Sequence, residues 1–159
     1  MVNHWYAGTA DDALALYRRA FRDVEVLAHV TYPESGLPDF MTPLAGSTMQ
    51  YEIAVHGSRL GMVNGDGTYT PSPAISQLVN FDPSAFPDAR EYLDAAWEVL
   101  ADGGNVRMPL GKYQHSPHYG TVEDRFGVGW QLMLTDPGRD PPFTPGSSFV
   151  VRCPDQATI

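Results

Sequence analysis

The sequence holds a single cysteine, Cys153, among its 159 residues. One cysteine cannot form a disulfide within a chain, and a chain without disulfides suits a reducing compartment. No apolar run approaches the roughly 20 residues that are needed to cross a bilayer. The first residues also lack the basic and apolar regions of a secretory signal. Together these absences predict a cytoplasmic protein with no membrane partner.

Basic residues are scarce as well: 10 Lys and Arg against 19 Asp and Glu give a formal net charge of −9. A surface of that sign repels phosphate groups, and no cluster of Lys and Arg offsets it. We therefore expect no binding to nucleic acid or to anionic membrane surfaces. The sequence contains no Gly-rich phosphate loop, paired-cysteine motif or HExxH motif. Cys153 has no neighbouring histidine that could activate it as a nucleophile.

The stretches 9–21 and 88–104 have the apolar spacing of helices. Thr9 and Asp88 stand where side chains cap helix N-termini. Gly103 stands where glycine often ends a helix. A helix is therefore predicted in each half of the chain.

Strands are predicted around each helix, because the segments there alternate or are rich in β-branched residues. The first half contains a hairpin whose turn is predicted at Gly57-Ser58. The tail is rich in Pro and Gly, although 147–152 could add a short edge strand. The predicted strand segments after the first helix are 24–32, the hairpin 47–67, 73–82, 105–113, 119–124 and 129–136.

The order strand, helix, three strands thus occurs twice, with a period of about 70 residues. We expect one α+β domain over residues 1–136, built from two βαβββ repeats at about 3–66 and 73–135. Residues 137–159 would form a Pro/Gly-rich C-terminal extension.

Four segments carry a family resemblance: "GTADDALALYRRAF", "TPSPAISQLVNFD", "LADGGNVRMPLGKY" and "YGTVEDRFGVGWQLML". The chain resembles the PhnB-like branch (3-demethylubiquinone-9 3-methyltransferase-like) of the vicinal oxygen chelate superfamily, the glyoxalase/bleomycin-resistance group. The resemblance implies two βαβββ modules that form a curved mixed sheet around a cup-shaped cavity, and commonly a homodimer. It does not imply methyl transfer, because Gly127-Val128-Gly129 precedes a strand instead of joining a strand to a helix.

Metal-using members of this superfamily hold a divalent cation with side chains from four strands. Carried over onto this chain, those positions fall at His4, near Leu60 or Met62, at Ser76 and at Gln131. Only His4 is a good ligand for a divalent cation. We therefore expect no tightly held metal and no other cofactor, with His4, Ser76 and Gln131 as degenerate metal positions.

The segment "KYQHSPHYG" at 112–120 contains His115 and His118, a spacing that can hold a metal. Pro117 between them favours a loop over a helix. We interpret this segment as a solvated loop that could fold over the cup as a lid. If either histidine acts, proton transfer or hydrogen bonding is favoured over metal binding, because the pKa of histidine lies near neutrality.

Other residues are expected to be structural. Trp97 and Trp130 are predicted core residues. Asp124 is expected to cap a tight turn, and Arg125 to pair with a carboxylate. His29 and His56 are placed on apparent strands, on outer faces.

The favoured hypothesis is a metal-free protein that binds a small molecule in the cup, as suits a mixture of aromatic, Met and polar side chains. The alternative is a metal-dependent enzyme of the glyoxalase, lyase, isomerase or dioxygenase kind, so catalysis stays open. A third hypothesis is a dimeric interaction module with a vestigial cup. The expected ligand-binding residues are His4, Tyr6, Met62, Asn64, Ser76, Gln131 and Met133 in the cup, and Tyr113, His115, His118 and Tyr119 in the lid.

Overall fold

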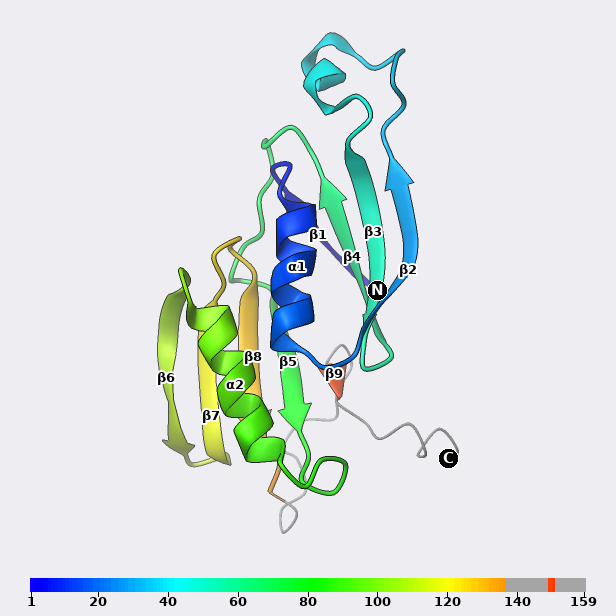
Figure 1. The fold of residues 1–159 in the computed structure, drawn as a ribbon. Coiled ribbons are helices and arrows are strands. Elements are labelled where there is room, and N and C mark those ends of the chain that lie inside the picture. Colours follow the sequence, from blue (N-terminus) through cyan, green and yellow to red (C-terminus); the bar gives the residue numbers. More distant parts are fainter. Residues whose placement is uncertain (137–148, 151–159) are drawn as a thin grey trace.

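The structure, a computed structural model, describes residues 1–136 and 149–150 (Figure 1). A βαβββ order occurs twice along the chain, with a short 3-10 helix in the loop after the second strand and a short strand near the C-terminus. The elements of the first unit are β1 (Val2–Tyr6), α1 (Ala10–Ala20), β2 (Val24–Thr31), η1 (Asp39–Leu44), β3 (Thr48–Val55) and β4 (Ser58–Asn64). Those that follow are β5 (Ser76–Phe81), α2 (Ala89–Ala101), β6 (Asn105–Tyr113), β7 (Ser116–Glu123), β8 (Gly129–Leu134) and β9 (Phe149–Val150).

The strands form two mixed sheets with the orders β1-β4-β3-β2 and β6-β7-β8-β5-β9. In each sheet the first strand of the unit runs parallel to the last, and the other strands of the unit pair as antiparallel hairpins. The α+β fold class predicted from the sequence is confirmed. The two sheets are separate, however, and do not close into one cup within the chain.

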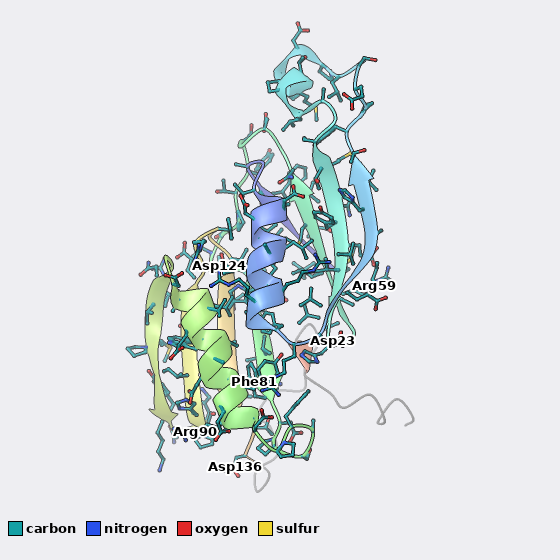
Figure 2. All side chains as sticks on the ribbon, viewed as in Figure 1. Asp23, Arg59, Phe81, Arg90, Asp124 and Asp136 are labelled. Atoms are coloured by element: carbon teal, nitrogen blue, oxygen red, sulfur yellow. The ribbon has the colours of Figure 1, made fainter. Side chains whose placement is uncertain are left out.

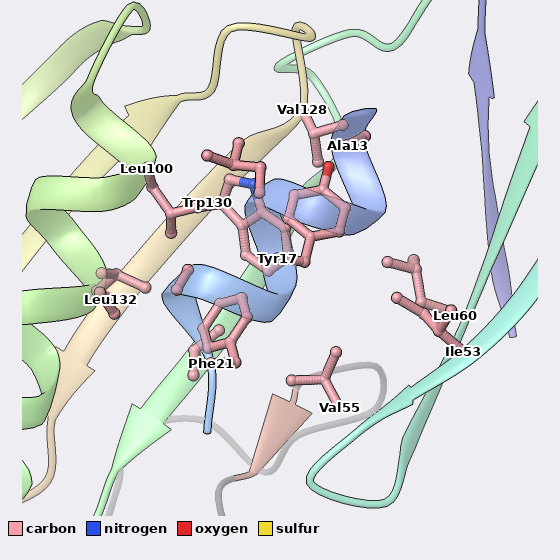
Figure 3. Packing of buried hydrophobic residues seen from close by; sticks show 14 of the residues in the cluster. Ala13, Tyr17, Phe21, Ile53, Val55, Leu60, Leu100, Val128, Trp130 and Leu132 are labelled. Carbon is pink, nitrogen blue, oxygen red and sulfur yellow. The ribbon is translucent and has the colours of Figure 1, made fainter. Parts of the chain in front are cut away.

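The first helix, α1, lies between the two sheets, and buried side chains of both sheets point toward it (Figure 3). Tyr17 of α1 packs edge-on against Trp130 of β8, with ring centroids 5.0 Å apart. From the first sheet, Ile53 and Leu60 join the same cluster. Trp130 is completely buried, as predicted, whereas Trp97 is only partly buried against this core. One hydrophobic core therefore joins both halves of the chain.

Each sheet also has a face turned away from the helices, which we call its open face. Strand alternation sorts the side chains, since successive residues point to opposite faces. In β8, Trp130 and Leu132 enter the core, which places Gln131 and Met133 on the open face of the second sheet. This alternation agrees with the sequence prediction.

Thr9 and Asp88 occupy the N-cap positions of α1 and α2, as predicted, but their side chains do not act as caps. Neither Thr9 nor Asp88 makes a side-chain hydrogen bond to the N-terminus of its helix. The carboxylate of Asp88 instead accepts from the guanidinium of Arg22, with Nη2 and Oδ2 2.6 Å apart. Arg125 pairs with the Asp102 carboxylate at 2.6 Å, as expected.

The β3–β4 turn lies one residue earlier than predicted. His56 and Gly57 have positive φ angles of 46° and 80°. Ser58 is already paired with Val55 in the ladder. A two-residue hairpin turn of this kind requires positive φ at both central residues, which Gly57 tolerates and a histidine adopts less readily.

The predicted edge strand within 147–152 is confirmed as β9, which lies parallel to β5. The rest of the predicted extension, including Cys153, lies outside the described residues. Across the part of the chain that the structure describes, no helix has both the length and the apolar character of a membrane span.

Candidate functional site

The open face of the second sheet carries a hollow of about 390 Å³. Its walls come from β5, β6, β7 and β8 and from the segment before β5. Gly129 provides room in it, because a Cβ there would lie 3.1 Å from Cβ of Ser76. The polar side chains that line the hollow are Ser76, Arg107, Thr121, Glu123 and Gln131.

The pairing of the strands brings these side chains to one face. Thr121 lies opposite Gln131, and Glu123 lies opposite Gly129. Ser76 of β5 is also in register with Gly129. Paired residues project to the same side of a sheet, so this part of the site follows directly from the register.

The side-chain amide of Gln131 is held at both ends. Its Nε2 donates to Oγ of Ser76 at 2.6 Å, and its Oε1 accepts from the hydroxyl of Tyr119 at 2.9 Å. Burial, with a smaller contribution from Tyr113, raises the pKa of Tyr119, so its phenol stays protonated and can donate. The sequence-predicted residues Ser76, Tyr119 and Gln131 therefore form one hydrogen-bonded chain.

One end of the open face is charged. Nη2 of Arg107 lies 2.5 Å from Oε2 of Glu123, and the Arg107 side chain is the more exposed of the two. The pair is accessible, so a polar ligand can exchange hydrogen bonds with either partner.

The other end is aromatic. The rings of Tyr113 and His115 lie near Tyr119, with centroids 5.6 Å and 4.5 Å from the Tyr119 ring. Met133 is in register with Tyr119 and so shares its face. His115 lies in the β6–β7 turn. This arrangement provides an apolar surface of aromatic rings next to the Gln131 amide.

His118 is not part of that surface. It lies within β7, so the predicted loop is wrong for this residue. Pro117 is accommodated because the pairing of β7 with β8 begins at Tyr119. The His118 side chain faces α2, where its Nε2 lies 2.6 Å from Oδ1 of Asp94. His115 and His118 therefore do not converge on a common point.

The residues expected from the first sheet also lie elsewhere. His4 and Tyr6 of β1 pair with Met62 and Asn64 of β4, and all four are buried on the side of the core. Their positions follow from alternation, which places every second residue of β1 on the same face. The structure does not bring them together with Ser76 and Gln131 in one hollow.

Each of these buried polar residues has a structural partner. Nε2 of His4 accepts from Nε2 of Gln77 at 3.0 Å. The hydroxyls of Tyr6 and Tyr17 are 3.0 Å apart. Oδ1 of Asn64 accepts from the backbone N–H of Ala10 at 3.0 Å, at the start of α1. Asn64 therefore satisfies a helix N-terminus across 54 residues of sequence, a role that no local pattern indicates.

Sequence reasoning also missed the extent of the network around Asp124. The expected turn is present, because Oδ1 of Asp124 accepts from the N–H groups of Phe126 and Val128 at 2.9 and 3.1 Å. Oδ2 also accepts from the hydroxyl of Tyr17 at 3.0 Å and from Nε1 of Trp130 at 2.8 Å. Asp124 lies beside α1, as Figure 2 shows, and this carboxylate ties α1 to the second sheet.

The donor set does not fit a tightly bound divalent cation. Ser76 and Gln131 are neutral and bonded to each other, and His4 lies on the core side of the first sheet. Among the described residues, no group of three or more His, Cys, Asp or Glu side chains could hold a metal ion. Such a cation prefers several charged or strongly donating ligands.

A family model described as 3-demethylubiquinone-9 3-methyltransferase matches residues 1–133. A putative 3-demethylubiquinone-9 3-methyltransferase, PhnB protein, from Bacillus cereus is 26% identical, covering 85% of this chain and 98% of its own, with a TM-score of 0.70. No curated protein matches the chain.

More distant structures share the fold. A glyoxylase/bleomycin resistance protein/dioxygenase domain from Frankia is 14% identical, covering 88% of this chain and 93% of its own, with a TM-score of 0.56. A fosfomycin resistance protein, FosX, from Listeria monocytogenes, solved with Mn(II) and a dihydroxypropylphosphonic acid, is 11% identical. That match covers 83% of this chain and 85% of its own, with a TM-score of 0.53.

Proposed function

Because the chain belongs to the family described as 3-demethylubiquinone-9 3-methyltransferase, the PhnB-like branch of the glyoxalase/bleomycin-resistance superfamily, we propose that it binds a small molecule. The ligand lies on the open face of the second sheet and needs no tightly held metal. The observation that carries this proposal is the Gln131 amide, fixed between Ser76 and Tyr119 beside a hollow of about 390 Å³.

The chemistry of the hollow suits binding. A fixed amide and the hydroxyls of Ser76 and Thr121 can orient a ligand by a few hydrogen bonds, with little further ordering of side chains. The aromatic surface at Tyr113 and Tyr119 can cover an apolar part of the same ligand.

Methyl transfer is not part of the proposal, despite the family's description. Gly127, with a φ of 89°, lies in the turn between β7 and β8. A nucleotide-type methyl donor is usually admitted by a Gly-rich turn that leads from a strand into a helix. This turn leads from strand to strand, so it lacks the helix N-terminus that such a cofactor uses.

The binding proposal can be tested by filling the hollow. Thr121→Trp adds a large side chain on the open face without entering the core, and Arg90→Trp on the exposed side of α2 is the matched control. In a thermal-shift screen of neutral aromatic compounds, all proteins also carry Ile75→Asp, at an exposed position outside this hollow, and we expect hits for this parent and for Arg90→Trp that Thr121→Trp loses. Hits that survive unchanged in Thr121→Trp would contradict the site.

Elemental analysis distinguishes the proposed metal-free binding protein from the alternative, a metal-dependent enzyme. The gently purified protein is expected to carry well under one divalent ion per chain after dialysis. One ion per chain that is required for ligand binding or turnover would overturn the proposal in favour of the enzyme.

We further propose that the protein is a homodimer. Strand β2 is the edge of the first sheet, and its Leu27 and Val30 are 43% and 44% exposed. An exposed apolar edge strand is a template for pairing with another chain. Val30→Lys should therefore lower the mass seen by light scattering after size exclusion toward 17.5 kDa, whereas a wild-type mass of one chain would contradict the dimer.

A further inference from the structure

A second hollow, of about 340 Å³, lies between β1 and the segment that connects β4 to β5. Residues 71–76 separate it from the hollow at Gln131. Pro71, Ser72 and Ile75 line the second hollow, whereas Pro73, Ala74 and Ser76 line the hollow at Gln131. Strand β1 is the edge of its sheet, so the hollow runs along a strand that pairs on one side only among the described residues.

Aromatic and aliphatic side chains form the wall of this hollow. The rings of Trp5 and Tyr69 meet edge-to-face with centroids 6.0 Å apart. Trp5, Tyr69 and Ile75 are 43%, 66% and 56% exposed, so much of their apolar surface faces solvent. Large apolar side chains that gather in one exposed patch commonly mark a binding site.

The Trp5 ring packs against Gly65, the residue that follows β4. A Cβ at Gly65 would lie 3.1 Å from a carbon of the Trp5 ring, so the ring rests against this glycine. An aromatic surface that is already ordered costs a ligand little conformational entropy to use.

The lining carries no formal charge at neutral pH. Its polar members are Asn3, Thr70 and Ser72, together with the buried His4, whose ring faces the core. Burial lowers the pKa of His4, and its Nε2 accepts from the Gln77 amide, so the ring is neutral with its proton on Nδ1. The −9 net charge of the chain repels anions as well.

We propose that this hollow is a second binding site, one that takes the planar aromatic part of an uncharged small molecule. The ring of the ligand packs against Trp5 and Ile75, and its polar edge bonds to the hydroxyl and amide groups of the lining. A volume of about 340 Å³ lies within the range of small-molecule pockets. The site does not depend on the hollow at Gln131.

The test uses the indole N–H signals of the three tryptophans in a proton–nitrogen correlation spectrum. The signal that is missing in Trp5→Phe identifies Trp5. Titration with naphthol is expected to move the Trp5 signal to saturation and to leave that of Trp97 in place. Cyclohexanol, which lacks the ring, and naphthoate, which carries a charge, are expected to leave all three signals in place.

Two variants complete the test. Ile75→Asp introduces a charge at an exposed wall position and should weaken naphthol binding about tenfold or more. Phe40→Ala is the matched control, because Phe40 is 67% exposed on η1 and does not line the hollow. Circular dichroism confirms that both variants are folded.

Three results would overturn the proposal: no movement of the Trp5 signal, equal movement with cyclohexanol, or binding that Ile75→Asp leaves unchanged. Movement of the Trp5 signal on dilution of the protein without naphthol would do so too, because a second copy of the chain would then occupy the hollow.

Discussion

Asp124 is a buried carboxylate, 3% exposed, that accepts hydrogen bonds from four donors. Two donors belong to its own turn, and the other two are Tyr17 of α1 and Trp130 of β8. Hydrogen bonds to a charged acceptor are stronger than neutral ones, and a buried donor left without a partner is costly. This single side chain thus stabilises both a turn and the packing of α1.

Asp124→Ala should lower the free energy of unfolding by about 3 kcal/mol or more, because four donors lose their acceptor at once. Urea unfolding followed by tryptophan fluorescence measures the change. The control is Asp102→Ala, whose exposed pairing with Arg125 is worth about 1 kcal/mol or less. If the two variants lose the same free energy of unfolding, the buried hydrogen bonds of Asp124 contribute no more to stability than the exposed ion pair does.

The sequence predicts one of the roles of Asp124 and some of the residues of the candidate site. The turn role of Asp124 is local, and the sharing of a face by Gln131 and Met133 follows from alternation within one strand. The bonds from Tyr17 and Trp130 join distant elements, so no local pattern reveals them. His4 was expected beside Gln131 because a family position was transferred by spacing, and the structure places it on the core side.

Among the elements, the β3–β4 hairpin is joined to α2 through its turn. The hydroxyl of Tyr92 accepts from the backbone N–H of Arg22 at 2.8 Å and is also hydrogen-bonded to Nε2 of His56 at 2.8 Å. Burial lowers the pKa of His56, which favours its neutral imidazole. The turn, α2 and the end of α1 thus meet at one phenol.

The pH dependence of stability follows from His56 and has a definite sign. Because the folded-state pKa lies below the unfolded value, the folded protein binds fewer protons, and stability falls as the pH drops below about 6.5. His4, whose pKa burial also lowers, acts in the same direction.

We therefore expect the free energy of unfolding to fall less steeply between neutral and mildly acidic pH in His56→Gln than in the wild type. Urea titrations at a series of pH values give both slopes. Identical slopes would mean that the His56 imidazole is not held neutral by its partners.

The elements themselves were largely predictable, since two long helices and the alternating strands have clear periodicities. Their ends were harder. Asp88 has the chemistry of a cap but binds Arg22, a partner 66 residues away. His118 belongs to strand β7 although Pro117 stands next to it. The strand tolerates this proline because its pairing with β8 begins only at Tyr119. In both places, contacts with distant parts of the chain determine the structure, and local sequence patterns do not reveal them.

At the scale of the molecule, one core serves both sheets. Helix α1 belongs to the first unit, yet Tyr17 and Phe21 pack against Trp130 of the second, with ring centroids 5.0 and 5.2 Å apart. The two helices also lie side by side across the units (Figure 1). Neither unit buries its apolar side chains without the other.

Unfolding should therefore be one cooperative transition. Tryptophan fluorescence, which reports largely on the second unit, and far-ultraviolet circular dichroism, which reports on both, are expected to give the same midpoint in urea. Two separated transitions would indicate that the units are stable independently.

The position of α1 between the sheets has a consequence for the history of the sequence. A repeated unit whose copies are stable alone can accumulate changes in each copy separately. Here Tyr17 meets Asp124, His4 meets Gln77 and Arg22 meets Asp88, each pair joining one unit to the other. Substitutions at these positions should appear in related sequences as matched pairs, so that the two halves of the chain evolve as a single inherited unit.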